Sequence, residues 1–286
     1  VFTSDGTTIL GADDKSAIAI ILEVMSVILE TRMDYPPVEI VFTVCEEIGL
    51  QGAKHLDDSL MDSRFGYILD STDTDGIVTR APAANKISVK VHGKAAHAGA
   101  APEKGVSAIL VTAKAISGLT LGRIDSETTC NIGTIKGGVA TNIVPDLVEI
   151  NGEARSHDPE KLDRVTREIV DAFSHVADHC RDASGFPRID AQVETDFPRT
   201  HIPEDHRVVT LAKKAAENIG RSMACKTIGG GADANIFFGR GIVAGVLGTG
   251  MQDVHTVNES IALSDMENCA RLVLEILTLH AAGAVD

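Results

Sequence analysis

The sequence contains no tryptophan, and aromatic residues make up only 3% of its 286 residues. Its core must therefore be built mainly from aliphatic side chains. Basic residues are also scarce, because 26 Lys and Arg face 41 Asp and Glu, which leaves a net charge of −15. This excess of acid is the opposite of a nucleic-acid-binding footprint and is unfavourable at an anionic membrane surface. We therefore expect neither nucleic acid nor membrane as a partner.

Long apolar segments are missing as well. No apolar run approaches the roughly 20 residues that span a bilayer, and the first residues lack the basic and apolar regions of a secretory signal. The five cysteines form no CxxC pair, and an odd number cannot pair completely within one chain. These absences favour a reduced, cytoplasmic protein.

The hydrophobic pattern changes twice along the chain. Residues 16–30 have the apolar spacing of a helix, and residues 38–45 form a nearly continuous apolar run. Such a run is typical of a strand buried on both faces of a parallel sheet. With a short helix near 52–60 and a strand at 67–69, it predicts a right-handed crossover unit.

Between Pro82 and Pro198 the expected strands alternate polar and apolar residues, as strands with one wet face do. Their order with the predicted helices is β-α-β-β-α-β, the order of a ferredoxin-like sandwich. We therefore predict an α/β domain made of residues 1–84 and 198–286, interrupted by a ferredoxin-like α+β domain at residues 85–197. Within the insert, residues 86–196 should form a four-stranded antiparallel sheet with two helices on one face.

Acidic residues stand where strands end or helices begin in the predicted α/β domain. Asp13 precedes a helix, Glu46 and Glu47 follow a strand, Asp70 ends another, and His255 lies in a later loop. In an open α/β sheet, ligands bind at the carboxyl ends of the strands. Several carboxylates brought together there repel one another unless cations neutralise them. Mixed carboxylate and imidazole ligands suit zinc, manganese or cobalt better than calcium or magnesium.

Each of these features has a simpler interpretation when taken alone. Glu46 and Glu47 could form a solvated turn, and Asp13 and Asp14 could simply cap a helix. The glycines at 229–231 could cradle a phosphate, although they lack the GxxxxGK[ST] spacing. No GxSxG motif of a serine hydrolase is present. The combination, rather than any single motif, favours a metal site.

Eight motifs follow one another along the chain: GADDK (11–15), CEEIGLQGAK (45–54), ILDSTD (68–73), HGKAAHAGAAPEKGVSA (92–108), TNIVPD (141–146), GEARSHD (152–158), GGGADANIF (229–237) and DVHTVNESI (253–261). Their order resembles that in the co-catalytic dinuclear zinc peptidases. This family includes peptidase T, a glutamate-releasing carboxypeptidase and acyl-amino-acid deacylases, and the motif sequences here are most similar to those of peptidase T-like members. The resemblance implies a zinc-peptidase α/β domain with an inserted ferredoxin-like dimerisation domain.

The resemblance also implies a metal site. Asp13 would bridge two zinc ions, Glu47 would be a ligand, Asp70 would bind one ion and His255 the other. Glu46 would be the general base. Manganese or cobalt would be alternatives to zinc.

Further residues take roles by the same resemblance. The Asp13–Asp14 peptide bond would be cis. His97, which on local sequence alone reads as a surface-loop histidine, would reach the active site of a partner subunit in a homodimer formed through the insert. Asn142 and Arg155, with the backbone of Gly231, would hold the substrate carboxylate or the scissile group.

One family element is not found in this sequence. The family has an HxD motif ahead of GADDK, whereas this chain starts at Val1, close before it. We therefore expect an enzyme fragment with reduced zinc occupancy and little activity; a non-catalytic binding or dimerisation protein is the alternative. The parent activity would be metal-dependent hydrolysis of short peptides, like that of a tripeptide aminopeptidase. Deacylation or carboxypeptidase cleavage of N-acyl amino acids is the alternative substrate class.

Overall fold

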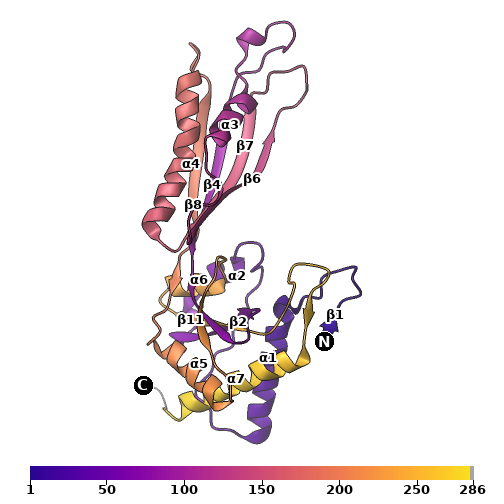
Figure 1. Ribbon diagram of the computed structural model, residues 1–286, viewed down its shortest axis with the longest axis vertical. Helices are drawn as coiled ribbons and strands as arrows, with labels where there is room; N and C mark the ends of the chain where they lie inside the picture. Colours follow the sequence, from indigo (N-terminus) through magenta and orange to yellow (C-terminus); the bar gives the residue numbers. More distant parts are fainter. Residues whose placement is uncertain (284–286) are drawn as a thin grey trace. The chain divides into compact units, whose positions relative to one another are not determined.

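A computed structural model describes residues 1–283 and divides the chain into two compact units (Figure 1). Unit 1 comprises Val1–Ala81 and the chain from Thr200 onward, and unit 2 comprises Pro82–Arg199. Unit 1 is a mixed α/β layer structure, and unit 2 is an antiparallel sheet with two helices. The predicted fold class, an α/β domain carrying a ferredoxin-like insert, is confirmed.

The main sheet of unit 1 draws its strands from both segments of the chain. Its order is β10 (Ala224–Thr227), β3 (Gly76–Ala81), β11 (Val243–Gly248) and β2 (Phe65–Ser71), and β9 (Thr200–His201) also pairs with β3. The pairs β10–β3 and β11–β2 are parallel, while β11–β3 is antiparallel. The sheet is therefore mixed, and it exists only when residues far apart in the sequence come together.

Three helices cover one face of this sheet: α1 (Ala12–Thr31), α5 (Arg207–Asn218) and α7 (Leu263–Ala281). Figure 1 shows α5 and α7 on one side of the strands and α6 (Asp233–Gly239) on the other. The buried residues of α1 recur every three or four positions, as on the core face of an amphipathic helix. The main apolar core of unit 1 lies under these helices and includes Ile20, Val24, Ile28, Ile77, Leu211, Leu247 and Leu272.

Short elements complete unit 1. The strands β1 (Phe2–Thr3) and β12 (Ser260–Ile261) form a two-stranded antiparallel sheet. The helix expected near 52–60 is split into α2 (Gln51–His55) and the 3-10 turn η1 (Asp58–Leu60). Within residues 1–283 no helix is both long and apolar enough to cross a membrane.

The prediction of a buried strand at 38–45 is wrong. This segment forms no strand, and its apolar side chains are largely exposed, with Phe42 at 51% and Val44 at 69%. A strand is stable only where a neighbour pairs its backbone groups, and β2 is the last strand of its sheet on this side. Across the described residues no strand pairs with 38–45. The expected crossover unit between this segment and β2 is therefore wrong as well.

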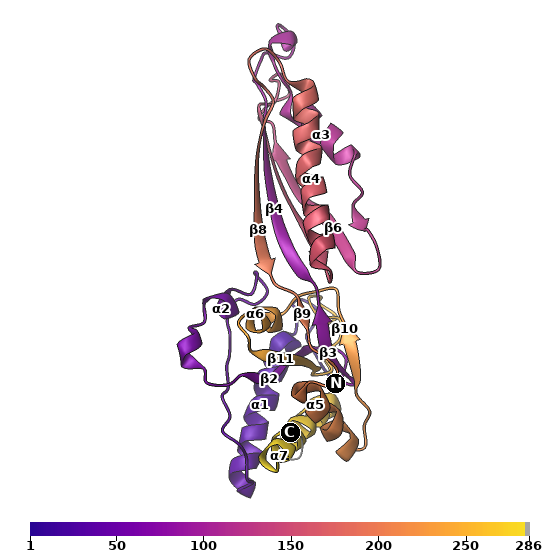
Figure 2. The same ribbon diagram turned by 90° about the vertical axis from the view of Figure 1, so that its left-hand side faces the viewer.

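The sheet of unit 2 is antiparallel, with the order β5 (Gly122–Arg123), β6 (Thr128–Gly137), β7 (Leu147–Ser156), β4 (Ala83–His92) and β8 (Arg188–Phe197). The four long strands have the arrangement expected of a ferredoxin-like sandwich, and β5 is a short addition. Figure 2 shows α3 and α4 on the same face of the sheet. These helices span Ala108–Ser117 and Pro159–Cys180, and η2 (Pro102–Lys104) precedes α3.

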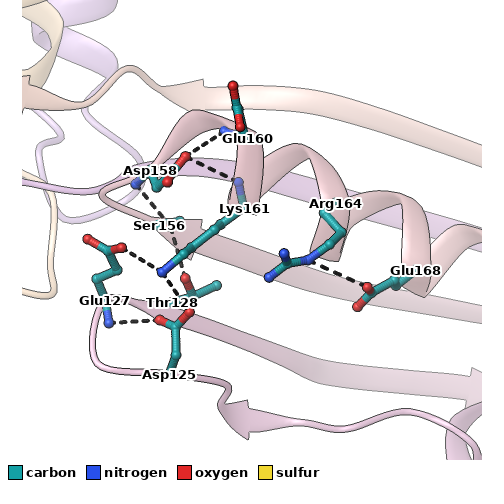
Figure 3. Close-up of polar contacts among 9 residues, drawn as sticks. All are labelled: Asp125, Glu127, Thr128, Ser156, Asp158, Glu160, Lys161, Arg164 and Glu168. Carbon is teal, nitrogen blue, oxygen red and sulfur yellow. Dashed lines mark hydrogen bonds and ion pairs between the residues drawn. The ribbon is translucent and has the colours of Figure 1, made fainter.

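Polar contacts fix the first turn of α4 (Figure 3). The Asp158 side chain accepts hydrogen bonds from the backbone N–H groups of Glu160 at 2.8 Å and Lys161 at 3.4 Å, as an N-cap residue does. The Lys161 ammonium lies 3.0 Å from Asp125 and 2.7 Å from Glu127. These contacts tie the start of α4 to the turn between β5 and β6.

Candidate metal centre

Three side chains of unit 1 converge on one point. The Nε2 atom of His255 lies 3.0 Å from Asp13 Oδ2 and 2.7 Å from Glu47 Oε1. One possible ligand atom from each residue lies within 4.8 Å of the other two. Two carboxylates and an imidazole are a donor set that zinc and similar ions bind. The structure thus brings together three of the four predicted metal ligands.

Irregular backbone positions these three side chains. Asp13 lies in the first turn of α1, where its backbone is not helical, and the Asp13–Asp14 peptide bond is cis, as the family resemblance implies. Asp14 Oδ1 accepts a 3.4 Å hydrogen bond from Ala17 N–H, which agrees with a helix-capping role for this second acid. His255 has a positive φ of 63°, and Glu47 lies in the loop before α2. None of the three is carried by the interior of a regular helix or strand.

The carboxylates around this point raise one another's pKa. Burial, followed by the charges of Asp13 and Glu46, raises the pKa of Asp70 to about 8. Burial, then Asp233 and Glu47, raises that of Glu46 to about 7. The pKa of Asp13 is also raised, first by burial and then by Glu47. The surroundings thus disfavour the charged form of each of these carboxyl groups, and a bound cation would relieve this, so the site is suited to a cation.

The pKa of His255 is also raised, which for an imidazole favours the charged form. Desolvation lowers its pKa, but the charge of Glu47 and the hydrogen bonds to Glu47 and Asp13 outweigh this, so that the pKa is raised overall. The surrounding carboxylates thus favour the imidazolium, whose positive charge partly balances theirs. A metal ion would take over that role and would require the neutral ring as a ligand.

Two further acids of unit 1 were not singled out from the sequence. Glu259 is 1% exposed, and its carboxylate accepts hydrogen bonds from Gly11 N–H at 2.6 Å and Asp13 N–H at 3.0 Å. Burial raises its pKa, but the backbone donors at Asp13 and Gly11 outweigh this, so that the pKa lies below its usual value. This side chain ties the Asp13 turn to the segment that carries His255. The second acid, Asp233, is 6% exposed.

Glu259 and Asp233 both lie inside quoted motifs, DVHTVNESI and GGGADANIF. Their presence in those motifs was the available signal. The hydrogen bonds that these two side chains make with distant residues cannot be read from the motifs.

His97 and Asn142 lie on adjoining loops of unit 2. The His97 side chain is exposed, and its Nδ1 accepts hydrogen bonds from Gly99 N–H at 3.2 Å and Ala100 N–H at 3.1 Å. In the neutral ring the proton therefore lies on Nε2, which is free to donate to a ligand. The backbone oxygen of Asn142 accepts from Ala98 N–H at 2.9 Å, which joins the two loops.

Arg155 lies near the opposite end of β7 from those loops. It is eight residues after Leu147, where β7 begins, or about 26 Å away at roughly 3.3 Å per residue. Its guanidinium contacts Glu153 at 2.9 Å and lies 5.9 Å from the Phe197 ring. Unit 2 therefore does not bring Arg155 and Asn142 together. Gly231 belongs to unit 1, in the loop before α6.

Several known proteins that are similar to this chain are peptidases. A model of the peptidase dimerisation domain of the M20 type matches residues 83–179, and a model of the M42 glutamyl aminopeptidases matches residues 4–89. The YqjE protein of Bacillus subtilis is 43% identical over 275 residues, which cover 96% of this chain and 73% of that protein.

Two solved structures resemble this chain at a comparable sequence identity. The aminopeptidase PepT from Bacillus cereus is 43% identical with a TM-score of 0.86, and a tripeptidase from Staphylococcus aureus is 42% identical with a TM-score of 0.89. Each alignment covers 98% of this chain and 74% of the other. Taken with the convergence of Asp13, Glu47 and His255, these similarities show that the chain belongs to the M20 family of metallopeptidases, among its peptidase T-like members.

Proposed function

We propose that the parent activity of this chain is the hydrolysis of peptide bonds in short peptides, in the manner of a tripeptide aminopeptidase. The observation that carries the proposal is the convergence of Asp13, Glu47 and His255 beside the acids Glu46 and Asp70. The aminopeptidase and tripeptidase structures that resemble this chain indicate the substrate class.

The donor set fits divalent cations. Asp13, Glu47, Asp70 and His255 would hold two zinc ions, for which manganese or cobalt could substitute. The raised pKa values of Asp13 and Asp70 support this, because a cation removes the repulsion that causes part of each shift. Once bound, such ions would supply Lewis acidity toward a peptide carbonyl and the attacking water.

The remaining candidate residues would transfer the proton and bind the substrate. Glu46, with a pKa of about 7, is suited to take a proton from the attacking water and return it to the departing amine. The His97 Nε2–H would donate a hydrogen bond to the oxyanion that develops on the carbonyl oxygen. The Arg155 guanidinium would bind a substrate carboxylate, for which its forked geometry is suited. Asn142 and the Gly231 backbone would complete the substrate contacts.

We also propose that residues 85–197 form a homodimer, in which His97 serves the partner's site. The strand β5 pairs only with the beginning of β6, so the rest of β6 is a sheet edge. Ile135 on that edge is 55% exposed, and Val139 beyond it is 82% exposed. Edge pairing is a direct route to a two-fold dimer. The protein would act in the cytoplasm, on peptides rather than on nucleic acids or membranes.

The activity is tested by incubating the full-length protein with a tripeptide panel and excess Zn²⁺, and by measuring released amino acids by chromatography. Zinc-dependent release that is lost in Glu46→Gln supports the proposal, and the exposed Glu194→Gln serves as the matched control. A panel of N-acyl amino acids is run in parallel. Turnover of that panel alone would replace the peptidase assignment by a deacylase, and no turnover of either panel would contradict the proposed activity.

The dimer is tested by mixing two inactive variants, His97→Ala and Glu46→Ala. If His97 acts in the partner's site, each heterodimer contains one site with both groups, and the mixture regains up to about half of the wild-type activity per heterodimer. If heterodimers form and the mixture stays inactive, His97 acts within its own subunit or not at all.

A further inference from the structure

We propose that Asp233 is a positioning residue, which holds the loop carrying Glu46 and Glu47 in place through a hydrogen bond to Thr43. The consequence for metal binding rests on the proposed function. The anchoring of the loop rests on the geometry of unit 1 alone.

The contact joins residues that are 190 positions apart. The Thr43 hydroxyl donates to Asp233 Oδ2 at 2.5 Å. Asp233 is 6% exposed, and its other carboxylate oxygen is buried without a hydrogen-bond partner in the part of the chain that the structure describes. Burying a carboxyl group with so few partners is costly, so removing the bond to Thr43 should destabilise this contact.

Asp233 is held firmly. It is the first residue of α6, and the Asn235 side chain accepts a 3.0 Å hydrogen bond from Ala232 N–H at the start of the helix. Ala234 packs with Val78 and Val246 of the sheet. The carboxylate therefore has a fixed position relative to the sheet and can act as an anchor.

The loop that it anchors is secured on its other side by backbone bonds. Leu50 N–H donates to Glu46 O at 2.7 Å, and Gly52 N–H donates to Val44 O at 2.8 Å. A Cβ on Gly52 would lie 2.4 Å from the Val44 backbone N and O atoms, so α2 packs directly against the loop at this position. The C-terminal side of the loop is thus fixed by α2.

The N-terminal side is attached at two points. The Glu39 carboxylate accepts hydrogen bonds from Asp62 N–H at 2.9 Å and Ser63 N–H at 2.8 Å, although residues 38–42 form no strand and are mostly exposed. Between Glu39 and Glu46, the Thr43–Asp233 bond joins this segment to α6. Removing it should loosen the chain that leads into Glu46 and Glu47.

Three variants separate a hydrogen-bonded anchor from a simple effect of the Asp233 charge. Thr43→Val removes the hydroxyl and keeps the shape and the carboxylate. Thr43→Ser restores a hydroxyl. Asp233→Asn keeps an oxygen acceptor for Thr43 and removes the charge.

The first measurement is amide hydrogen exchange of the metal-free chain, followed by mass spectrometry of peptides from residues 43–52. Thr43→Val should exchange about 5–10-fold faster there, as expected for the loss of one hydrogen bond, while α7 peptides stay unchanged. Thr43→Ser and Asp233→Asn should stay within about 3-fold of the wild type. An unchanged rate in Thr43→Val, or a large change confined to Asp233→Asn, would overturn the anchor.

The second measurement is Co²⁺ affinity by calorimetric titration. Thr43→Val should bind about 10-fold more weakly, as losses of outer-shell partners typically do, and Thr43→Ser should bind like the wild type. Faster exchange with unchanged Co²⁺ affinity would show that the anchor does not position the ligands. If the wild-type chain binds no Co²⁺, the proposed metal function fails, and the exchange rates alone decide whether the anchor is correct.

Discussion

The two units of this chain assemble their sheets in different ways. In unit 2, the sheet consists of antiparallel pairs drawn from one continuous segment, and α3 and α4 cover one face. In unit 1, a mixed sheet is assembled from two separate segments of the chain. Exposed apolar side chains occur in both units, such as Leu22 of α1 and Val193 of β8. Unit 2 therefore has a conventional sandwich, whereas unit 1 carries the repelling carboxylates.

The difference concerns where the acidic residues lie. The four long strands of unit 2 pair with one another within that unit. Unit 1 gathers Asp13, Glu46, Glu47 and Asp70 on turns and strand ends, where their charges oppose folding until a cation is bound. The predicted metal ligands therefore all lie in unit 1.

The largest expected effect is in the core of unit 2. Phe173 of α4 is fully buried, so Phe173→Ala should lower the free energy of unfolding by about 3–5 kcal/mol. Urea unfolding followed by circular dichroism measures this. The control is Leu110→Ala in the same unit, where the side chain is 56% exposed and the expected change is below about 0.5 kcal/mol. Equal losses in both variants would contradict the two-layer core.

The next effect concerns the metal ligands of unit 1. Glu47→Gln removes a charged ligand, and we expect Co²⁺ affinity to fall more than about 100-fold, beyond the range typical of outer-shell changes. Titration calorimetry of the wild type and the variant measures the difference. The exposed Glu194→Gln in unit 2 should bind Co²⁺ normally. Normal affinity in Glu47→Gln would remove this residue from the site.

The units should also respond differently to pH in the absence of metal. The pKa values of Asp70 and Glu46, about 8 and about 7, lie above their ordinary values of 3.8 and 4.5. Folded unit 1 therefore keeps protons that the unfolded chain has lost, so its stability falls as pH rises from about 4 to about 8. In the presence of a metal chelator, calorimetry should show a Tm of unit 1 about 5 °C lower at pH 8 than at pH 5.

Unit 2 supplies the internal control for this trend. Hydrogen bonds from Glu127 N–H and Lys161 lower the pKa of Asp125 to about 2, so its contribution is complete above about pH 4 and is lost only in more acidic solution. The titration of Asp125 should therefore not change the stability of unit 2 between pH 5 and pH 8. Excess Zn²⁺ should abolish the trend in unit 1. A Tm for unit 1 that rises with pH in chelator would contradict the clustering of these acids.

The smallest expected effect is on the exposed face of α1. Leu22→Ser should change the free energy of unfolding by less than about 0.5 kcal/mol, because the side chain is 55% exposed. Ile20→Val, on the buried face of the same helix, should cost about 1 kcal/mol. Chemical denaturation of both variants makes the comparison. A larger decrease in the free energy of unfolding of Leu22→Ser would show that this face of α1 is covered in solution.

Local patterns were sufficient for most of unit 2. The alternation of polar and apolar residues between Pro82 and Pro198 predicted the antiparallel sheet that the structure shows, because these strands pack one face against α3 and α4. The same reasoning failed at 38–45. The apolar composition there indicates a strand, but a strand also requires a neighbour, and composition does not show whether one is present.

The sequence by itself determined the chemical character of the site, because ordered motifs and acids at strand ends already indicated Asp13, Glu47, Asp70 and His255 as metal ligands. The tertiary structure alone decided which of them meet and what holds them. It joined Asp13, Glu47 and His255, and it placed Arg155 at the far end of β7 from Asn142. It also revealed Glu259 and Asp233 as anchors. The physical reason is that hydrogen bonds and charge repulsion depend on distance in space, which residues about 190 to 250 positions apart acquire only when the chain folds.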